Sequence, residues 1–389
     1  MKKINLAAPC MVGNEFEYVR QAFESNWIAP LGPFVERLEK DVCKYTGSAS
    51  AVALSSGTAA IHLALLEAGV KDGDIVFCSD MTFTASANPI AYCGAHPVFI
   101  DCEQETFGMS PKALERAFDR YKPKAVIVAS IYGIPAKLDE LLTICKRHGV
   151  PMIEDSTEVL GSTLNGKAAG TFGNFGTYSF NGNKIITTSG GGMLVSSDKK
   201  AISHALHLAT QAKEHSDYYE HRELGYNYRM SNVSAAIGVG QLERIDDLIA
   251  AKKAIHDRYA EEFKCLEQYG VRMLNPPRNC TSNYWLSILL LGDESCTKPA
   301  NVVHALRRAE IEARHIWKPL HTQELWMNAG CRFITEYDVT PMPWSDYFFT
   351  HGVCLPSDVN MTGEELNRVI AVVKNEIDWS LRLNYQHGY

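Results

Sequence analysis

The chain has 389 residues, of which 46% are hydrophobic and 21% charged, and its formal net charge is −7. A chain of this length exceeds one simple hydrophobic core, so two domains are expected. The net charge is negative, and the sequence does not resemble the basic sequences of nucleic-acid-binding proteins. No nucleic acid is therefore expected as a partner. The 11 cysteines are scattered and include no Cys-x-x-Cys pair, which is typical of reduced thiols in a large protein.

The sequence also argues against a membrane protein. No apolar run approaches the roughly 20 residues that a membrane-spanning helix requires. The two lysines near the N-terminus are not followed by a sustained apolar segment of the kind found in secretory signals. We therefore expect a cytoplasmic protein without a membrane span.

In the first 200 residues, short apolar runs alternate with helical patterns. Strands are predicted at residues 51–54, 74–78, 97–101, 125–129 and 150–155, and helix-like segments such as 61–69 and 138–145 lie between them. Strands without internal polar alternation, separated by helices, indicate a mainly parallel sheet covered on both faces. Right-handed crossovers then bring the carboxyl ends of the strands to one edge, where ligands bind in such sheets.

The pattern changes from about residue 245 onward. Residues 244–263 read as one long amphipathic helix, followed by a turn-rich segment, a strand-like run at 285–291 and helices near 302–308 and 365–377. The sequence therefore predicts a large domain over residues 1–245 and a smaller α+β domain over residues 246–389.

A small polar turn follows the first predicted strand and opens a helix. It contains Ser56, Gly57 and Thr58. Glycine allows close approach of the backbone, and a helix N-terminus offers free amides to an anion. The turn suits a phosphate monoester, although an ordinary capped helix start would have the same composition.

Asp155 and Lys184 form the most informative pair in the sequence. Asp155 ends a predicted strand, and Lys184 lies 29 residues later among small and polar residues. Pyridoxal 5′-phosphate (PLP) chemistry needs these two groups: a lysine that forms the Schiff base, and a carboxylate that keeps the pyridine nitrogen protonated. Each residue alone could be structural, but together with the phosphate turn they predict a PLP site.

Two other residues are placed near the same edge by their position after predicted strands. Phe83 could stack against the pyridine ring, with a core phenylalanine as the alternative. Glu158 could reach the O3′ side of the ring, or could lie on a solvated helix. The glycines at 190–192 follow the lysine and lack the Gly-x-Gly-x-x-Gly spacing, which argues against a NAD-dependent dehydrogenase.

The motifs taken together resemble the DegT/DnrJ/EryC1/StrS family of PLP-dependent nucleotide-sugar aminotransferases, over almost the whole chain. The matching segments are residues 26–32, 56–59, 154–155, 178–184, 225–232 and 314–321. The resemblance implies fold type I, in which a mainly parallel sheet between helices is joined to a smaller α+β C-terminal domain. Ser156 and Glu158 depart from the alanine and glutamine that many relatives carry there. A dehydratase branch replaces the lysine with histidine, so Lys184 favours amino transfer.

The resemblance also implies a role for each matching residue. Lys184 would be the Schiff-base lysine and proton shuttle, and Asp155 would pair with the pyridine nitrogen. The phosphate would be held by Ser179, Gly57, Thr58 and, from a second subunit of a homodimer, Asn227. The sugar and nucleotide would be bound by Asn26, Trp27, Ile28, Ala29, Ser56, Arg314, His315, Ile316 and Trp317, with His221 and Lys318 as further diphosphate ligands.

Within the family, residues 181–193, 209–212, 219–221 and 317–324 resemble enzymes of the bacillosamine pathway. This resemblance implies transfer of an amino group from L-glutamate to C4 of a UDP-linked 4-keto-6-deoxy-N-acetylhexosamine. Amination at C3, or of a GDP- or dTDP-linked sugar, remains an alternative. A non-catalytic regulator that binds PLP or a nucleotide sugar is a different class of alternative, against which the intact Lys184 and Asp155 argue.

Overall fold

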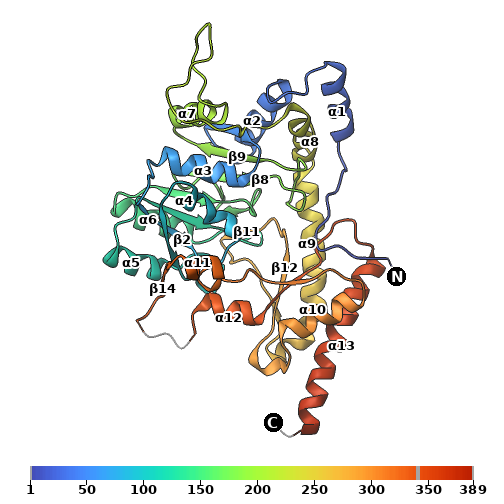
Figure 1. The fold of residues 1–389 in the computed structure, drawn as a ribbon. Coiled ribbons are helices and arrows are strands. Elements are labelled where there is room, and N and C mark those ends of the chain that lie inside the picture. The colour runs from blue at the N-terminus through green and yellow to red at the C-terminus, as the bar shows by residue number, and fades with distance from the viewer. Residues whose placement is uncertain (1, 339–341, 388–389) are drawn as a thin grey trace.

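The computed structural model describes residues 2–338 and 342–387. Within these ranges the strands form an eight-stranded sheet, a separate four-stranded sheet and a small three-stranded one. Figure 1 shows the large sheet between layers of helices, and a long helix that leads from this part to the smaller C-terminal part. The predicted α/β architecture with a smaller second unit is confirmed.

The large sheet has the strand order β1-β9-β8-β5-β4-β2-β3-β14. Only β9 runs against its neighbours β1 and β8, and the other pairs are parallel. The mainly parallel sheet predicted from the sequence is therefore confirmed. The strands are β1 (Ser50–Leu54), β2 (Ile75–Ser79), β3 (His96–Ile100), β4 (Ala125–Ala129), β5 (Met152–Asp155), β8 (Phe175–Ser179), β9 (Gly192–Ser196) and β14 (Arg332–Ile334).

Both faces of this sheet are covered, which explains why the central strand β4 is apolar at every position. In β4, Ala125 and Ile127 pack into one core, whereas Val126 and Val128 pack into the core on the opposite face. The first core is closed by α3 (Gly57–Glu67), α4 (Asn88–Tyr92) and α7 (Lys199–Ala209). The opposite face is covered by α2 (Pro33–Thr46), α5 (Pro111–Arg120), α6 (Leu138–Arg147) and α8 (Asn232–Leu242), and α1 (Glu15–Glu24) packs on α8.

The smaller unit is an antiparallel sheet covered by helices. Its strands are β10 (Arg272–Met273), β12 (Ser287–Leu290), β15 (Gly352–Leu355) and β13 (Arg314–His315), and its helices are α10 (Pro299–Arg308) and α13 (Gly363–His387). Helix α9 (Ile245–Phe263) belongs to both units, because Leu248 packs in the large core and Tyr259 in the small one. The long helix predicted at 244–263 is confirmed.

Two segments cross the predicted boundary at residue 245. Ile4 forms a bridge with Ile311 and packs in the core of the smaller unit. Strand β14 returns from the C-terminal part and extends the large sheet beside β3. The two units therefore share chain segments in both directions. The remaining elements are β6 (Thr163–Leu164), β7 (Lys167–Ala168), β11 (Cys280–Thr281), α11 (Glu324–Asn328) and α12 (Trp344–His351).

His321 ties the chain between the two units to the edge of the large sheet. Its Nδ1 lies 2.7 Å from the carboxylate of Asp80, directly after β2, and its Nε2 lies 3.5 Å from Asp346 in α12. Its ring also stacks on Phe333 of β14 at 3.8 Å. Burial lowers the pKa of His321, but the hydrogen bonds and charges of Asp346 and Asp80 outweigh burial and raise the pKa to about 9.

This link should make the stability of the fold depend on pH. Because the pKa of His321 is raised from 6.5 to about 9 on folding, its contribution is complete below pH 6.5 and is lost as the pH rises through 9. We expect His321→Gln to lower the free energy of unfolding by about 2 kcal/mol at low pH, allowing for partial solvent screening, and by much less above pH 9. Urea unfolding of both proteins across this range would check it; a constant difference would contradict it.

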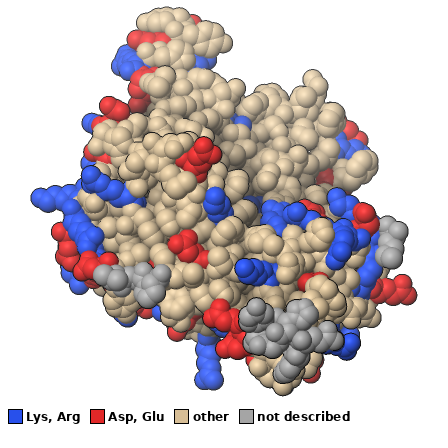
Figure 2. All heavy atoms as spheres, turned by 60° about the horizontal axis from the view of Figure 1, so that its bottom comes forward, with Lys and Arg blue, Asp and Glu red and all other residues tan. Residues whose placement is uncertain are grey.

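No helix among the described residues is long and apolar enough to cross a membrane. On the face shown in Figure 2, acidic and basic side chains are interspersed, and much of the upper part is uncharged. This mixed surface agrees with the modest net charge of −7.

Candidate active site

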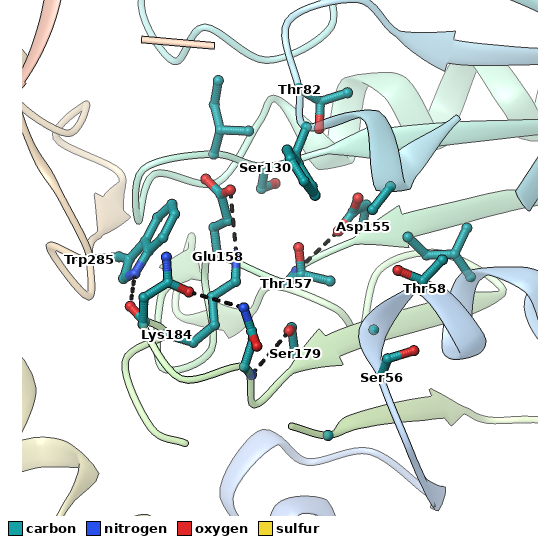
Figure 3. A pocket seen from close by; sticks show the side chains of 18 of the residues that line it. Ser56, Thr58, Thr82, Ser130, Asp155, Thr157, Glu158, Ser179, Lys184 and Trp285 are labelled. Atoms are coloured by element: carbon teal, nitrogen blue, oxygen red, sulfur yellow. Dashed lines mark hydrogen bonds and ion pairs between the residues drawn. The ribbon is translucent and has the colours of Figure 1, made fainter. Parts of the chain in front are cut away.

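A cavity of about 410 Å³ opens at the carboxyl edge of the large sheet. Its walls come from the segments that follow β1, β2, β4, β5 and β8, as expected for a parallel sheet. Figure 3 shows polar side chains from these segments converging on one space. Trp285, Arg314 and Trp317 close it from the smaller unit.

One end of the cavity is built to hold an anion. Ser56 caps α3 by accepting a hydrogen bond from the Ala59 amide at 3.0 Å. The first amides of the helix, at Gly57 and Thr58, have no acceptor within the helix and are available to a ligand. A Cβ at Gly57 would lie 3.1 Å from the Cβ of Ser179, so glycine is what permits this close approach. We call this group of hydroxyls and amides the phosphate cradle, because it suits a phosphate; its residues are Ser56, Gly57, Thr58 and Ser179.

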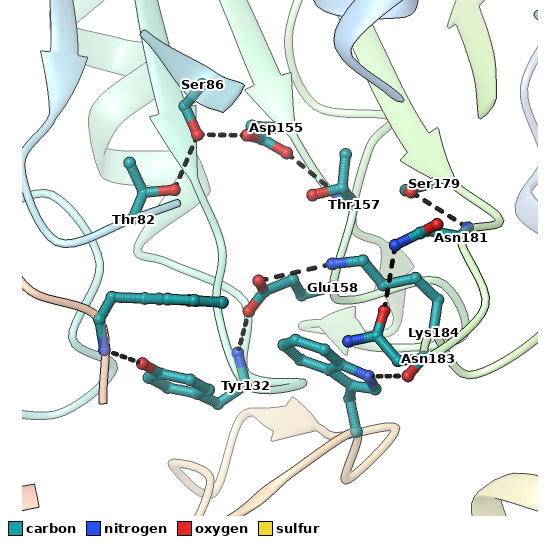
Figure 4. Close-up of polar contacts among 12 residues, drawn as sticks. Thr82, Ser86, Tyr132, Asp155, Thr157, Glu158, Ser179, Asn181, Asn183 and Lys184 are labelled. Atoms are coloured by element: carbon teal, nitrogen blue, oxygen red, sulfur yellow. Dashed lines mark hydrogen bonds and ion pairs between the residues drawn. The ribbon is translucent and has the colours of Figure 1, made fainter. Parts of the chain in front are cut away.

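Asp155 is held in the cavity wall by two donors. The Ser86 hydroxyl donates to its Oδ2 at 2.5 Å, and the Thr157 amide donates to its Oδ1 at 3.2 Å. Thr82 lies 2.7 Å from Ser86 and extends this chain of polar contacts, which Figure 4 shows. Asp155 is 4% exposed and lines the cavity, and the two hydrogen bonds fix the orientation of its carboxylate.

Lys184 reaches the cavity from the loop after β8. Its Nζ lies 3.5 Å from Glu158 Oε1 and 4.2 Å from the centre of the Trp285 ring. The other oxygen of Glu158 accepts the Tyr132 amide at 2.9 Å. Burial raises the pKa of Glu158, although the charge of Lys184 opposes that effect. The lysine is therefore directed inward rather than into solvent.

The outer wall is aromatic. Phe83 lies 5.2 Å from Trp317, measured between ring centres. The Trp317 amide donates to the Tyr132 hydroxyl at 2.6 Å, which fixes this segment over the cavity. Arg314 is the cationic side chain beside it, and its guanidinium is 3.8 Å from Glu312. Phe83 is 52% exposed, so it is not a core residue and remains free to contact a ring.

The structure brings just over half of the predicted site residues together. Those lining the cavity are Ser56, Gly57, Thr58, Phe83, Asp155, Glu158, Ser179, Lys184, Arg314 and Trp317. Those outside its lining in the single chain are Asn26, Trp27, Ile28, Ala29, His221, Asn227, His315, Ile316 and Lys318.

The residues outside the cavity fall into three places. Residues 26–29 form the exposed loop between α1 and α2, where Asn232 donates to the Trp27 carbonyl at 2.8 Å. Asn227 and His221 belong to a loop that begins after α7, at the upper end of the molecule in Figure 1, and Asn227 pairs with Thr210. Beside Arg314, the Ile316 side chain points into the core instead, where it is 2% exposed. His315 lies 5.6 Å from Phe349, and Lys318 is exposed.

Sequence reasoning did not assign a role to Ser86, Tyr132, Thr157 or Trp285. Ser86 lies three residues after Phe83 and seven after the end of β2, so its place near the sheet edge was a usable signal. Thr157 lies two residues after Asp155 and carried the same signal. Tyr132 and Trp285 are fully buried aromatic residues whose role depends on tertiary contacts, and their sequence context resembles ordinary core.

These groups fit PLP. The phosphate cradle, the buried carboxylate and the inward lysine match the three polar features of that cofactor: its phosphate, its pyridine nitrogen and its aldehyde. The crowding at Gly57 leaves room for backbone approach but not for a side chain. Fold and site together define a PLP-dependent transferase.

Comparison with known proteins supports the assignment as a PLP-dependent transferase. The chain belongs to the DegT/DnrJ/EryC1/StrS aminotransferase family, whose model matches residues 9–374. It is 48% identical to the putative pyridoxal phosphate-dependent aminotransferase EpsN of Bacillus subtilis over 377 residues, covering 96% of this chain and 95% of that protein. It is 34% identical to GDP-perosamine synthase of Vibrio cholerae, covering 94% and 97%.

Solved structures give the same result. The putative sugar aminotransferase Spr1654 of Streptococcus pneumoniae, in its PMP form, superposes with a TM-score of 0.89 at 26% identity, covering 99% of this chain and 100% of that one. The predicted fold type, the aminotransferase activity and the PLP cofactor are confirmed.

Proposed function

We propose that this enzyme transfers an amino group from L-glutamate to C4 of a UDP-linked 4-keto-6-deoxy-N-acetylhexosamine. The observation that carries the amino transfer is the placement of Lys184 and Asp155 in one cavity with a phosphate cradle. The sugar and its nucleotide are supported by the resemblance of residues 181–193 and 317–324 to bacillosamine-pathway enzymes.

When bound, PLP supplies an aldehyde that links to amines and a ring that withdraws electrons from the attached carbon. Asp155 holds the proton on the ring nitrogen, supported by Ser86 and Thr157. Lys184 Nζ would take a proton from the donor Cα and return it two atoms along, beyond the nitrogen, and would repeat this in reverse for the sugar. Ser179 and the α3 amides hold the phosphate in place, so each substrate meets the same fixed groups.

A second copy of the chain is part of this proposal. In the single chain, Asn227 and the loop at 26–29 lie outside the cavity, although the family resemblance assigns them to the phosphate and sugar sites. The 26–29 loop exposes Trp27 and Ile28 to about half, which is unusual for large apolar side chains unless they meet a ligand or a subunit. We infer a homodimer in which the partner supplies these residues, with Arg314, Lys318 and His221 near the diphosphate.

A GDP-linked sugar is the second candidate. The GDP-perosamine synthases of Vibrio cholerae and of Caulobacter vibrioides are 34% and 33% identical to this chain over 94% and 96% of its length. These relatives favour a keto sugar on GDP. For either candidate, Lys184 and Asp155 of this chain would carry the amino transfer, and the candidates differ in the nucleotide of the substrate.

A substrate panel separates these candidates. Purified enzyme with PLP and L-glutamate would be incubated with UDP-, GDP- and dTDP-linked 4-keto-6-deoxy sugars, and with a 3-keto sugar. We expect the UDP-N-acetyl sugar to be aminated with a kcat/KM at least about 100-fold above the others, because a nucleotide site discriminates by several hydrogen bonds. Mass spectrometry and NMR of the product identify the aminated carbon. Preference for the GDP sugar would overturn the UDP assignment, and no turnover of any sugar would favour a regulator.

A further inference from the structure

Trp285 and Glu158 present two different attractive surfaces to the same ammonium group. The Trp285 ring centre is 4.2 Å from Lys184 Nζ, and the carboxylate of Glu158 is 3.5 Å from it. Both side chains are almost wholly buried, at 1% and 4% exposed. A cation is attracted to an indole face and to a carboxylate most strongly where water is excluded.

One buried residue joins the backbones of Trp285 and Glu158. The Asn283 side chain accepts the Trp285 amide at 2.9 Å and donates to the Glu158 carbonyl at 3.0 Å. The Trp285 carbonyl accepts Lys252 Nζ at 3.2 Å, and its indole N–H donates to Asn183 next to the catalytic lysine at 2.5 Å. Trp285 is therefore restrained on several sides, and Figure 3 shows its position beside the lysine.

The backbone leading into Trp285 supports a functional reason for this placement. Tyr284 has φ of 51°, a left-handed conformation that non-glycine residues adopt at a cost. That conformation turns the chain between β11 and β12 so that Trp285 enters the cavity from the smaller unit. A core tryptophan would not need to lie against the ammonium of the lysine on which the enzyme depends.

We propose that Trp285 and Glu158 form a dock that holds the free ammonium of Lys184 whenever the lysine is not linked to the cofactor. In each amino transfer the lysine is released and must later return to the same position. The dock restrains the flexible side chain beside its point of action, so Trp285 and Glu158 act as positioning residues. The negative charge of Glu158 suits it to this role, because the neutral amide of a glutamine at the same position would attract the ammonium less strongly.

The proposal is tested on enzyme loaded with pyridoxamine 5′-phosphate, in which Lys184 is free. The protein would be treated briefly with an acetylating reagent, and acetylation of Lys184 would be measured by mass spectrometry relative to the exposed Lys40 of the same sample. We expect Glu158→Gln and Trp285→Leu each to raise labelling of Lys184 about tenfold, because loss of either contact releases the amine. Trp285→Phe, which keeps an aromatic face, should give a smaller rise.

Glu105→Gln is the matched control. It makes the same carboxylate-to-amide change in an ion pair with Lys137 that lies outside the lining of this cavity, so labelling of Lys184 should remain at the wild-type level. Glu158→Gln keeps the shape of the side chain and decides the outcome if Trp285→Leu fails to fold. Unchanged labelling in Glu158→Gln, or an equal rise in Glu105→Gln, would overturn the dock.

Discussion

Replacing Lys184 with alanine should reduce turnover by at least about a thousandfold while PLP still binds. Positioned proton transfer commonly contributes 10²–10⁴-fold in rate, and we propose that this residue also forms the link to the cofactor. The phosphate cradle at Ser56–Thr58 and the carboxylate of Asp155 remain in the variant, so the cofactor keeps most of its noncovalent contacts. Single-turnover assays with L-glutamate would measure the loss.

Covalent trapping gives an independent readout of the same variant. Borohydride treatment of the wild-type enzyme should fix the cofactor on the chain, with a mass increase on the peptide containing Lys184, and the variant should release its cofactor on denaturation. Lys40→Ala is the control, since this side chain is exposed on α2 and, among the described residues, its one ion-pair partner is Glu36 at 3.7 Å. A Lys184→Ala enzyme that transaminates at the wild-type rate would refute the assignment.

The elements at the sheet edge could be predicted from the sequence because their signal is local. Asp155 follows an apolar strand, and the Ser56 turn follows another, so parallel topology alone places both at the carboxyl edge. The long helix α9 was also readable, because its apolar positions repeat at helical spacing over its 19 residues. Tertiary structure then confirmed what periodicity had indicated.

Trp285 and β14 could not be predicted in the same way. The indole of Trp285 contacts Asn183 from 102 residues away in the chain, and its neighbours in sequence read as an ordinary buried strand. Strand β14 is three residues long, and only its pairing with β3 makes it a strand. Both depend on contacts between distant segments, for which periodicity carries no information.

The residues outside the cavity show a related limit. Ile316 lies two positions after Arg314 in a segment expected to bind the substrate, yet it packs against Gly352 of β15 and into the core. A motif specifies which segment approaches a ligand, whereas the direction of each side chain depends on local backbone geometry. Asn227 and His221 lie on a loop after α7, so their role depends on the subunit arrangement proposed above.

Asp155→Asn should lower kcat by about 10²–10³-fold with a smaller effect on cofactor affinity. Asparagine has nearly the same shape and can still accept the Thr157 amide, but it carries no negative charge toward the ring nitrogen. Its amide group would also meet the Ser86 hydroxyl, which now donates to Oδ2 at 2.5 Å. Loss of a buried charge opposite a cation is worth several kcal/mol, which corresponds to this range in rate.

Ser86→Ala distinguishes the effect of the Asp155 charge from the effect of the hydrogen bond that Ser86 donates to it. It removes one hydrogen bond to Asp155 and leaves the carboxylate in place, so we expect a loss of only about tenfold. Stopped-flow measurement of the half-reaction with L-glutamate would compare the two variants, and titration with PLP would give their affinities. If Asp155→Asn were no slower than Ser86→Ala, the carboxylate would serve only to orient its neighbours, because removing its charge would then cost no more than removing one of its hydrogen bonds.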